Sequence, residues 1–224
     1  MTLGRLAALL LALVVLAGCG EEQAGAGRAT LWITRDRGAD VIKTADVPAG
    51  ISAMEALRRE ADVDTRYGGR FVHAIDGIEG SVAEQRDWFY FVNGYEANIG
   101  AADYRLHAGD VVWFDYRSWA EEMRVPVAVG AFPEPFVHGY DGRRRSAVVV
   151  ARPGPLARRI AGLVRGRVNG PREGANVLVL VAGSALRAGL SGDAGDPVTF
   201  YVGRKIAGRL ARDPAFARFR YSIP

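Results

Sequence analysis

The aromatic segment at residues 88–92, followed by Asn93-Gly94, constrains the fold of this chain more than any other feature. Five consecutive apolar residues, WFYFV, are typical of a strand that is contacted on both faces. Asn-Gly is the strongest short-range signal of a β-hairpin, because a type I′ turn requires positive φ at both central residues. The sequence therefore predicts an aromatic strand that lies inside a sheet and turns sharply at residues 93–94.

The segments around this strand predict a β-grasp-like arrangement in residues 29–120. Ser52 and Glu55 form the S-x-x-E pattern of a capping box, which predicts the start of a helix with Met54 and Leu57 on its apolar side. One helix can cover one face of a small sheet and leaves the other face open. The strands are expected at residues 30–34, 41–44, 71–75, 88–92 and 111–116.

The first residues are not expected to belong to the fold. The apolar run from Leu6 to Ala17 is too short to cross a hydrocarbon core of roughly 30 Å as a helix, and it fits the central region of a secretory signal peptide. The run ends in LAGC, which resembles the bacterial lipobox, where the cysteine receives a diacylglycerol and the signal is cleaved before it. We predict residues 1–18 as a lipoprotein signal peptide, Cys19 as lipidated and residues 19–28 as a tether. This places the protein on the extracytoplasmic face of the cell membrane; an ordinary signal peptide with an incidental cysteine is the alternative.

Charge divides the 224 residues into two halves. Residues 20–120 hold 11 Arg or Lys and 17 Asp or Glu, a net charge of −6, whereas residues 121–224 hold 17 and 8, a net charge of +9. This asymmetry predicts either an acidic domain docked on a basic one or a basic face toward an anionic lipid or polymer. Nucleic acid is not an expected partner of an exported protein. The single cysteine excludes a disulfide framework, and three histidines far apart in sequence indicate no metal site.

Residues 121–224 predict a small α/β domain with a partly parallel sheet, so that the whole chain is α+β. Pro155 suits the first position of a helix that runs through Arg165, and a further helix is expected near residues 205–212. Residues 132–136, FPEPF, are expected to form an extended connector. The strands are expected at residues 125–129, 146–150, 177–181 and 198–202, the third being an apolar run typical of a buried parallel strand.

Several segments of the first half, taken in order, resemble the DUF4430 domain family. They are residues 52–57 (SAMEAL), 76–78 (DGI), 88–94 (WFYFVNG), 102–104 (ADY) and 106–113 (LHAGDVVW). This domain is similar to the C-terminal β-domain of transcobalamin and intrinsic factor, and the resemblance spans residues 29–119. It implies a role in binding cobalamin or another ligand outside the cell. In the vertebrate carriers the vitamin lies between this domain and a helical barrel, and this sequence shows no pattern of such a barrel.

One face of the strand at residues 111–116 is expected to remain open. Alternate residues of this strand form two sets, of which one is uniformly apolar or aromatic: Val112, Phe114 and Tyr116. The other set is mixed and combines Trp113 with Asp115. We assign the uniform set to the core under the helix, which places Trp113 on the open face.

The strand at residues 88–92 is expected to add two aromatic side chains to that face. If Phe89 and Phe91 face the helix, Trp88 and Tyr90 join Trp113 and form an aromatic platform for a large, flat, partly apolar ligand. The alternative is that these rings pack against the second domain or against each other. Residues around the hairpin and its return complete the predicted ligand-binding set: Tyr95, Asn98 and Tyr104.

Catalytic patterns are not recognised in this sequence. Gly183-Ser184-Ala185 lacks the spacing of a nucleophile elbow, and the glycine-rich residues 189–195 lack the lysine of a phosphate-binding loop. We therefore expect not an enzyme but an exported, lipid-anchored protein that captures a cobalamin-like or other small ligand for a membrane uptake system. No cofactor is indicated apart from cobalamin as a bound ligand. The alternative is a non-catalytic module of the cell envelope that binds another protein.

Overall fold

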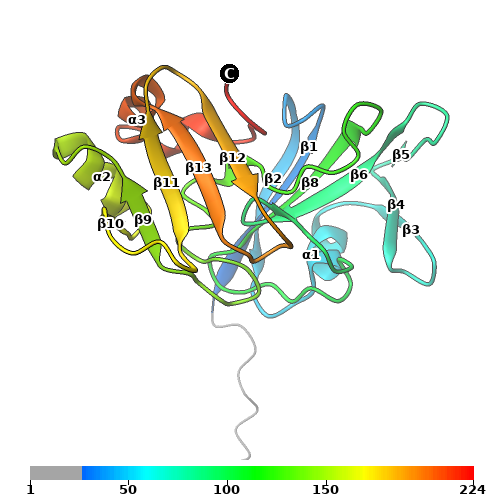
Figure 1. The fold of residues 1–224 in the computed structure, drawn as a ribbon. Coiled ribbons are helices and arrows are strands. Elements are labelled where there is room, and N and C mark those ends of the chain that lie inside the picture. Colours follow the sequence, from blue (N-terminus) through cyan, green and yellow to red (C-terminus); the bar gives the residue numbers. More distant parts are fainter. Residues whose placement is uncertain (1–26) are drawn as a thin grey trace, which may run out of the picture.

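The computed structural model describes residues 27–224 and arranges them around two five-stranded sheets and one smaller sheet (Figure 1). Residues 1–26, and with them the predicted signal peptide and Cys19, lie outside the described residues. The chain is α+β, as predicted, with few and short helices. Within residues 27–224 no helix is both long and apolar enough to span a bilayer.

The N-terminal half forms the predicted β-grasp-like sheet. Its strand order is β2 (Asp40–Pro48), β1 (Arg28–Arg35), β8 (Val111–Ser118), β6 (Arg86–Val92) and β7 (Tyr95–Glu96). β1 runs parallel to β8, and the remaining neighbours are antiparallel. The turn between β6 and β7 contains Asn93 and Gly94 with φ of 51° and 85°, as the type I′ prediction requires.

Helix α1 (Ala53–Glu60) packs Met54 and Leu57 into the core of this half, as the apolar pattern predicts. The Ser52 side chain accepts a hydrogen bond from the backbone N–H of Glu55 at 3.0 Å and caps the helix. The Glu55 carboxylate instead accepts a hydrogen bond from Arg59, four residues on, at 2.8 Å. A small sheet beside this half consists of β3 (Val63–Arg66), β4 (Phe71–Ile75) and β5 (Ile78–Glu79).

The C-terminal half forms the predicted partly parallel sheet. Its strand order is β10 (Arg167–Val168), β9 (Ala147–Val150), β11 (Asn176–Val181), β13 (Val198–Gly203) and β12 (Leu186–Leu190). The first four strands are parallel, and β12 pairs with β13 in the antiparallel sense. Helices α2 (Pro155–Leu163) and α3 (Arg204–Leu210) both pack on one face of this sheet, where Ile160 and Ile206 join Leu178 and Phe200 in the core.

Three expectations for this half are wrong. The connector at residues 132–136 is not extended but consists of turns, in which the Glu134 N–H donates to the Ala131 carbonyl and the Phe136 N–H to the Pro133 carbonyl. Residues 125–129 are not a strand, because only Val127 forms an isolated bridge, with Tyr95; the segment crosses the N-terminal sheet and enters the 3₁₀ helix η1 (Val129–Ala131). β11 is parallel, as expected, but it is buried on one face only, since Leu178 is inaccessible while Val177 and Val179 remain half-buried.

One hydrophobic core runs through both halves. The connector at residues 132–136 places Phe136 edge-on against Phe200 of β13, with ring centroids 5.0 Å apart. After the C-terminal sheet and α3, the chain passes through a second 3₁₀ helix, η2 (Pro214–Ala217), and its last residues return to the N-terminal sheet. This return decides which surface of the N-terminal sheet is left for a ligand.

Candidate ligand-binding site

The pairing of β6 with β8 divides the predicted aromatic platform between two faces of the sheet. Side chains directly opposite each other in antiparallel strands project on the same face. The opposite pairs are Trp88 with Tyr116, Tyr90 with Phe114, and Phe91 with Trp113. Trp88 and Tyr90 therefore lie on the helix side, and the prediction that they share a face with Trp113 is wrong. Both alternate sets of residues 88–92 are apolar, so the sequence pattern could not decide which set faces the helix.

The face that carries Trp113 is not open. Tyr221, from the last residues of the chain, lies edge-on against Trp113 and Phe91, with ring centroids 5.3 Å from each. Trp113 is only 1% exposed, and its Nε1 donates a hydrogen bond to the Thr34 hydroxyl at 2.7 Å. The face predicted to be open for a ligand is thus covered by the last residues of the chain.

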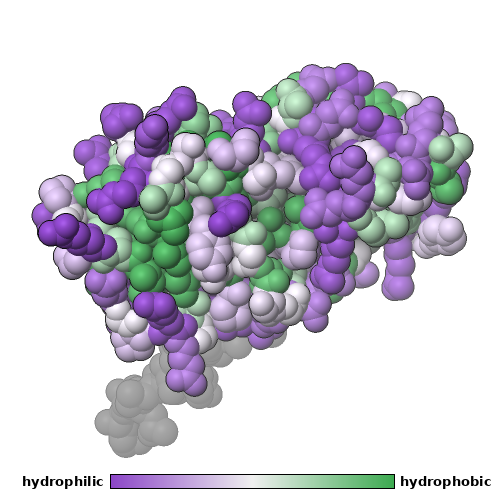
Figure 2. Space-filling model, turned by 45° about the horizontal axis from the view of Figure 1, so that its top comes forward, coloured by the Kyte–Doolittle hydropathy of each residue, from purple (hydrophilic) through white to green (hydrophobic). Residues whose placement is uncertain are grey.

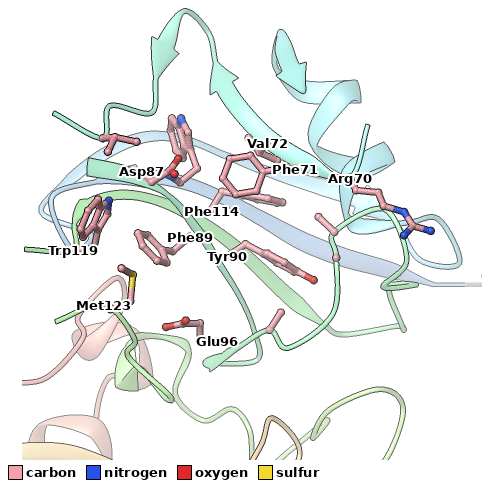
Figure 3. Close-up of a pocket in the computed structure, with 15 residues that line it drawn as sticks. Arg70, Phe71, Val72, Asp87, Phe89, Tyr90, Glu96, Phe114, Trp119 and Met123 are labelled. Carbon is pink, nitrogen blue, oxygen red and sulfur yellow. The ribbon is translucent and has the colours of Figure 1, made fainter. Parts of the chain in front are cut away.

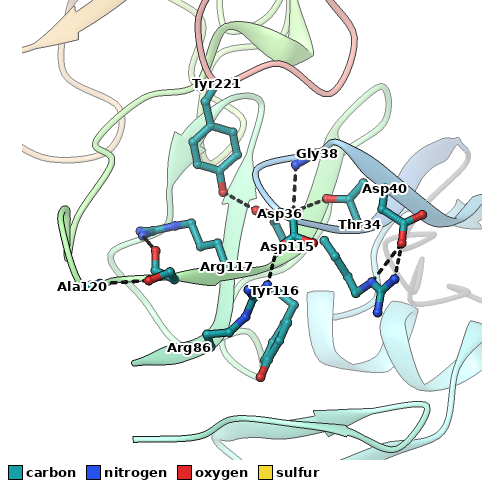
Figure 4. A network of polar contacts seen from close by, with 12 residues as sticks. Thr34, Asp36, Gly38, Asp40, Arg86, Asp115, Tyr116, Arg117, Ala120 and Tyr221 are labelled. Carbon is teal, nitrogen blue, oxygen red and sulfur yellow. Dashed lines mark hydrogen bonds and ion pairs between the residues drawn. The ribbon is translucent and has the colours of Figure 1, made fainter. Parts of the chain in front are cut away.

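A buried polar network fixes this closure (Figure 4). The Asp115 carboxylate accepts hydrogen bonds from the Tyr221 hydroxyl at 2.8 Å, from the Gly38 backbone N–H at 3.1 Å and from the Thr34 hydroxyl. Burial, together with the neighbouring Asp115, raises the pKa of Tyr221 well above its ordinary value. The tyrosine therefore remains a neutral donor, and the C-terminal segment is anchored by a directional contact as well as by packing.

An open cavity of about 440 Å³ lies instead along the edge of β6 (Figure 3). β7 pairs only with Phe91 and Val92, so the first part of β6 forms the margin of the sheet. The other walls are β4, Val82 before β6, Phe114 of β8, and the loops after β7 and β8. Its lining includes Arg70 and a set of large aromatic or apolar side chains: Phe71, Trp88, Phe89, Tyr90, Phe114, Trp119 and Met123.

Trp88 and Tyr90, two of the predicted ligand-binding residues, are held rigidly in this cavity. The Trp88 Nε1 donates to the carbonyl of Ile78 at 2.8 Å. The Tyr90 ring stacks on Phe114 with centroids 5.3 Å apart and an interplanar angle of 18°, and its hydroxyl donates to the carbonyl of Ile99. Burial raises the pKa of Tyr90, so the ring stays neutral. Because the polar atoms of both rings are already paired, they offer a ligand mainly apolar surface.

A buried arginine, Arg117, holds the cavity wall that the loop after β8 forms. The guanidinium of Arg117 lies over the Phe89 ring, 3.6 Å from its centroid, and is inaccessible to solvent. It donates to the carbonyls of Glu122 at 2.8 Å and Met123 at 3.0 Å, and it lies 3.6 Å from the Glu96 carboxylate. Arg117 thereby positions the loop that brings Trp119 and Met123 to the cavity.

The cavity combines apolar walls with the carboxylates of Asp87 and Glu96, the Arg70 side chain and an exposed apolar rim. Burial raises the pKa of both Asp87 and Glu96, and nearby positive charges and backbone N–H groups only partly offset this effect. At the rim, Phe71 is 40% exposed and Met123 60% exposed. Large exposed apolar residues around one cavity are typical of a surface that contacts an apolar ligand.

The remaining predicted site residues lie elsewhere. Tyr95 is buried where the halves meet, and its hydroxyl donates to the carbonyl of Asp196 at 2.8 Å. Tyr104 is buried, and its hydroxyl accepts from the Asp141 backbone N–H at 3.0 Å. Asn98 is exposed and accepts from Tyr140 at the rim of a separate, polar cavity. The structure thus places Trp88 and Tyr90 together in the cavity along β6. Tyr95, Tyr104 and Asn98 instead lie around Tyr140, and Trp113 is apart from both groups.

Most residues that line the cavity were not predicted as ligand-binding, among them the large side chains of Phe71, Phe89, Trp119 and Met123. Trp119 and Met123 lie on either side of the acidic pair at residues 121–122, and two large apolar side chains in such a polar loop are a sequence signal that could have indicated them. Within residues 27–224, His, Cys, Asp and Glu form no group of three or more that could hold a metal ion.

Comparison with known proteins confirms the DUF4430 resemblance. Residues 50–118 match the model of this family, which is described as a domain of unknown function. No curated protein sequence matches the chain.

Two solved structures are similar over less than half of the chain. A protein from Ruminococcus gnavus ATCC 29149 that is proposed to bind a metal has 13% identity and a TM-score of 0.34; the match covers 41% of this chain and 97% of that one. Haptocorrin in complex with Cbi has 12% identity and a TM-score of 0.32; the match covers 40% of this chain and 24% of haptocorrin.

Proposed function

We propose that this chain is a binding protein, anchored outside the cytoplasmic membrane through Cys19, that takes up a small apolar or aromatic compound in the cavity along β6 and presents it to a membrane uptake system. One observation carries the proposal: rigid aromatic side chains from β6 face an open, mostly apolar cavity with an exposed apolar rim. The proposal assigns no reaction to the chain.

The cavity size limits the ligand. A volume of about 440 Å³ lies in the range of small-molecule sites, which extends from about 300 to 1,000 Å³. Cobalamin, which the DUF4430 resemblance suggests, is larger, so only one edge of its ring would enter. A flat compound that reaches from Tyr90 to Met123 fits better, and a positively charged group on it would meet the Asp87 or Glu96 carboxylate.

Tryptophan fluorescence tests this proposal. Trp88 and Trp119 line the cavity, whereas Trp113 is buried in the second hydrophobic cluster and Trp32 lies beside a separate, more polar cavity. A ligand along β6 should therefore change the emission of the first pair only. A form that starts at Gly20 would be titrated with cobalamin, cobinamide and the apolar dye anilinonaphthalene sulfonate. We expect a saturable change that Trp119→Phe reduces and Trp32→Phe leaves intact.

Two matched variants locate the site. Met123→Glu should weaken binding about tenfold, because it places a charge at the apolar rim. Val41→Glu introduces the same charge at an exposed apolar residue of β2, away from the cavity, and should not change the affinity. Absence of a saturable change with all three compounds, or equal effects of both variants, would contradict the proposal.

A further inference from the structure

The C-terminal sheet has an apolar face that is not part of either hydrophobic core of residues 27–224. Helices α2 and α3 occupy one face, so alternate residues of the strands project from the other. We call this second surface the valine face; it consists of Val150, Val177, Val179, Val181, Thr199 and Tyr201. Its first five residues are half-buried and Tyr201 is 39% exposed, while Val148, at one end, is covered. Figure 2 shows a continuous hydrophobic area where Figure 1 places β9 and β11.

Such a face is unusual for a sheet of this kind. Parallel strands are almost always covered on both faces. Where one face of a sheet is exposed to water, the residues on that face are normally polar. Here β11 projects three valines on its uncovered side. The composition of this face is typical of a surface that contacts a binding partner.

The charges around the valine face indicate which kind of partner binds it. The five strands contain two charged residues, Arg167 and Arg187, and no acidic residue. Arg167 lies opposite Val148 and Arg187 opposite Tyr201, so both project on the valine face, from the two edge strands. The guanidinium of Arg187 lies 5.7 Å from the centroid of the Tyr201 ring. An apolar surface is thus bordered on two sides by exposed positive charge, in a half of the chain with a net charge of +9.

We propose that the valine face docks on the surface of an anionic lipid bilayer. Arginine at a membrane surface is attracted by anionic headgroups, and tyrosine favours the boundary between headgroups and acyl chains. The valines would then contact the acyl region between the two arginines. A second copy of the chain fits less well, because stacking two such faces would bring the arginines of both copies together. This inference does not depend on the cavity along β6.

Fluorescence quenching by lipids tests the proposal with the full chain. In a Cys19→Ala background, Thr199→Cys introduces a single thiol on the valine face, opposite Val177, for an environment-sensitive fluorophore. The labelled chain is added to vesicles of phosphatidylcholine with phosphatidylglycerol, or of phosphatidylcholine alone, containing a doxyl-lipid quencher. We expect an emission shift to shorter wavelength and quenching in the anionic vesicles only. A label at exposed Asp64→Cys of β3, in the other half, should show neither effect.

Paired charge variants test the role of the arginines. Arg167→Gln with Arg187→Gln should return quenching of the Thr199→Cys label to the level in neutral vesicles. Arg158→Gln with Arg159→Gln removes the same charge from the exposed side of α2 and should leave the quenching unchanged. All four arginines are exposed, and circular dichroism would check that the fold is retained.

Several outcomes would overturn the proposal. The first is a Thr199→Cys label that is not quenched in anionic vesicles. The second is equal quenching of the Asp64→Cys label, because the N-terminal segment would then hold the chain at the membrane without orienting it. The third is an emission shift without vesicles that grows with protein concentration, because a second copy of the chain would then cover the valine face.

Discussion

The two five-stranded sheets of this protein are built alike on one face and differ on the other. One face of each sheet is covered by helices: α1 covers the N-terminal sheet, and α2 and α3 cover the C-terminal sheet. On the second face, the N-terminal sheet presents large aromatic rings, which the C-terminal residues and the segment at 125–131 cover, whereas the C-terminal sheet presents valines that stay outside both cores. The aromatic face is therefore the one that the chain itself covers, and the valine face is the one left accessible. Burial of large aromatic rings contributes more free energy of folding than burial of valine side chains.

The strongest test of this difference compares an aromatic residue from each second face. Trp113→Ala should lower the free energy of unfolding by about 3–5 kcal/mol, because it leaves a void in a closed cluster. Tyr201→Ala should change it by about 0.5 kcal/mol or less, because the ring is already partly in water. Urea denaturation followed by circular dichroism measures both. Similar losses would mean that the two faces are equally covered.

The hydroxyl of Tyr221 offers a smaller and more specific test. Tyr221→Phe keeps the ring but removes one donor from the buried Asp115 carboxylate, which should cost about 1–3 kcal/mol. Tyr201→Phe removes a hydroxyl that water solvates and should have almost no effect. The same denaturation experiment compares the two variants, and a neutral Tyr221→Phe would show that packing alone closes the N-terminal sheet.

The helix side of the N-terminal sheet provides the next test. Ser52→Ala removes the side-chain acceptor for the Glu55 N–H and should lower the free energy of unfolding by about 1 kcal/mol. Ser52→Asp supplies another acceptor and should retain most of the stability. If both variants were equally unstable, the position would contribute through packing, not through the cap.

The connector between the two sheets should give the smallest effect. His138 Nδ1 lies 2.6 Å from the Glu134 carboxylate, and this hydrogen bond raises the pKa of His138 above its ordinary value of 6.5. The fold thus favours the protonated ring, so the stabilisation is complete below pH 6.5 and is lost as the pH rises through the raised pKa. Because the ring is about one-third exposed, the effect should be about 1 kcal/mol or less.

Denaturation of the wild type and of His138→Gln at a series of pH values measures this contribution. The difference in stability should shrink as the pH rises. A constant difference would mean that the pair contributes through shape and not through charge.

Local patterns predicted the elements of the fold better than the site. The Asn93-Gly94 turn, the Ser52 cap and the Pro155 helix start depend on neighbouring residues only, and all three are confirmed. The placement of Trp88 and Tyr90 with Trp113 failed, because it required the pairing of β6 with β8, which residues 88–92 do not encode by themselves. The cavity was missed because its walls come from six separate segments of the chain.

By itself the sequence determined two mixed halves of opposite charge, the DUF4430 resemblance, most of the strands and the parallel character of the C-terminal sheet, because periodicity, turn residues and charge act over short distances. Only the tertiary structure decided which surfaces are interior. Tyr221 reaches Asp115 across 106 residues, and no local pattern can specify whether so distant a segment covers an aromatic face or leaves it to a ligand.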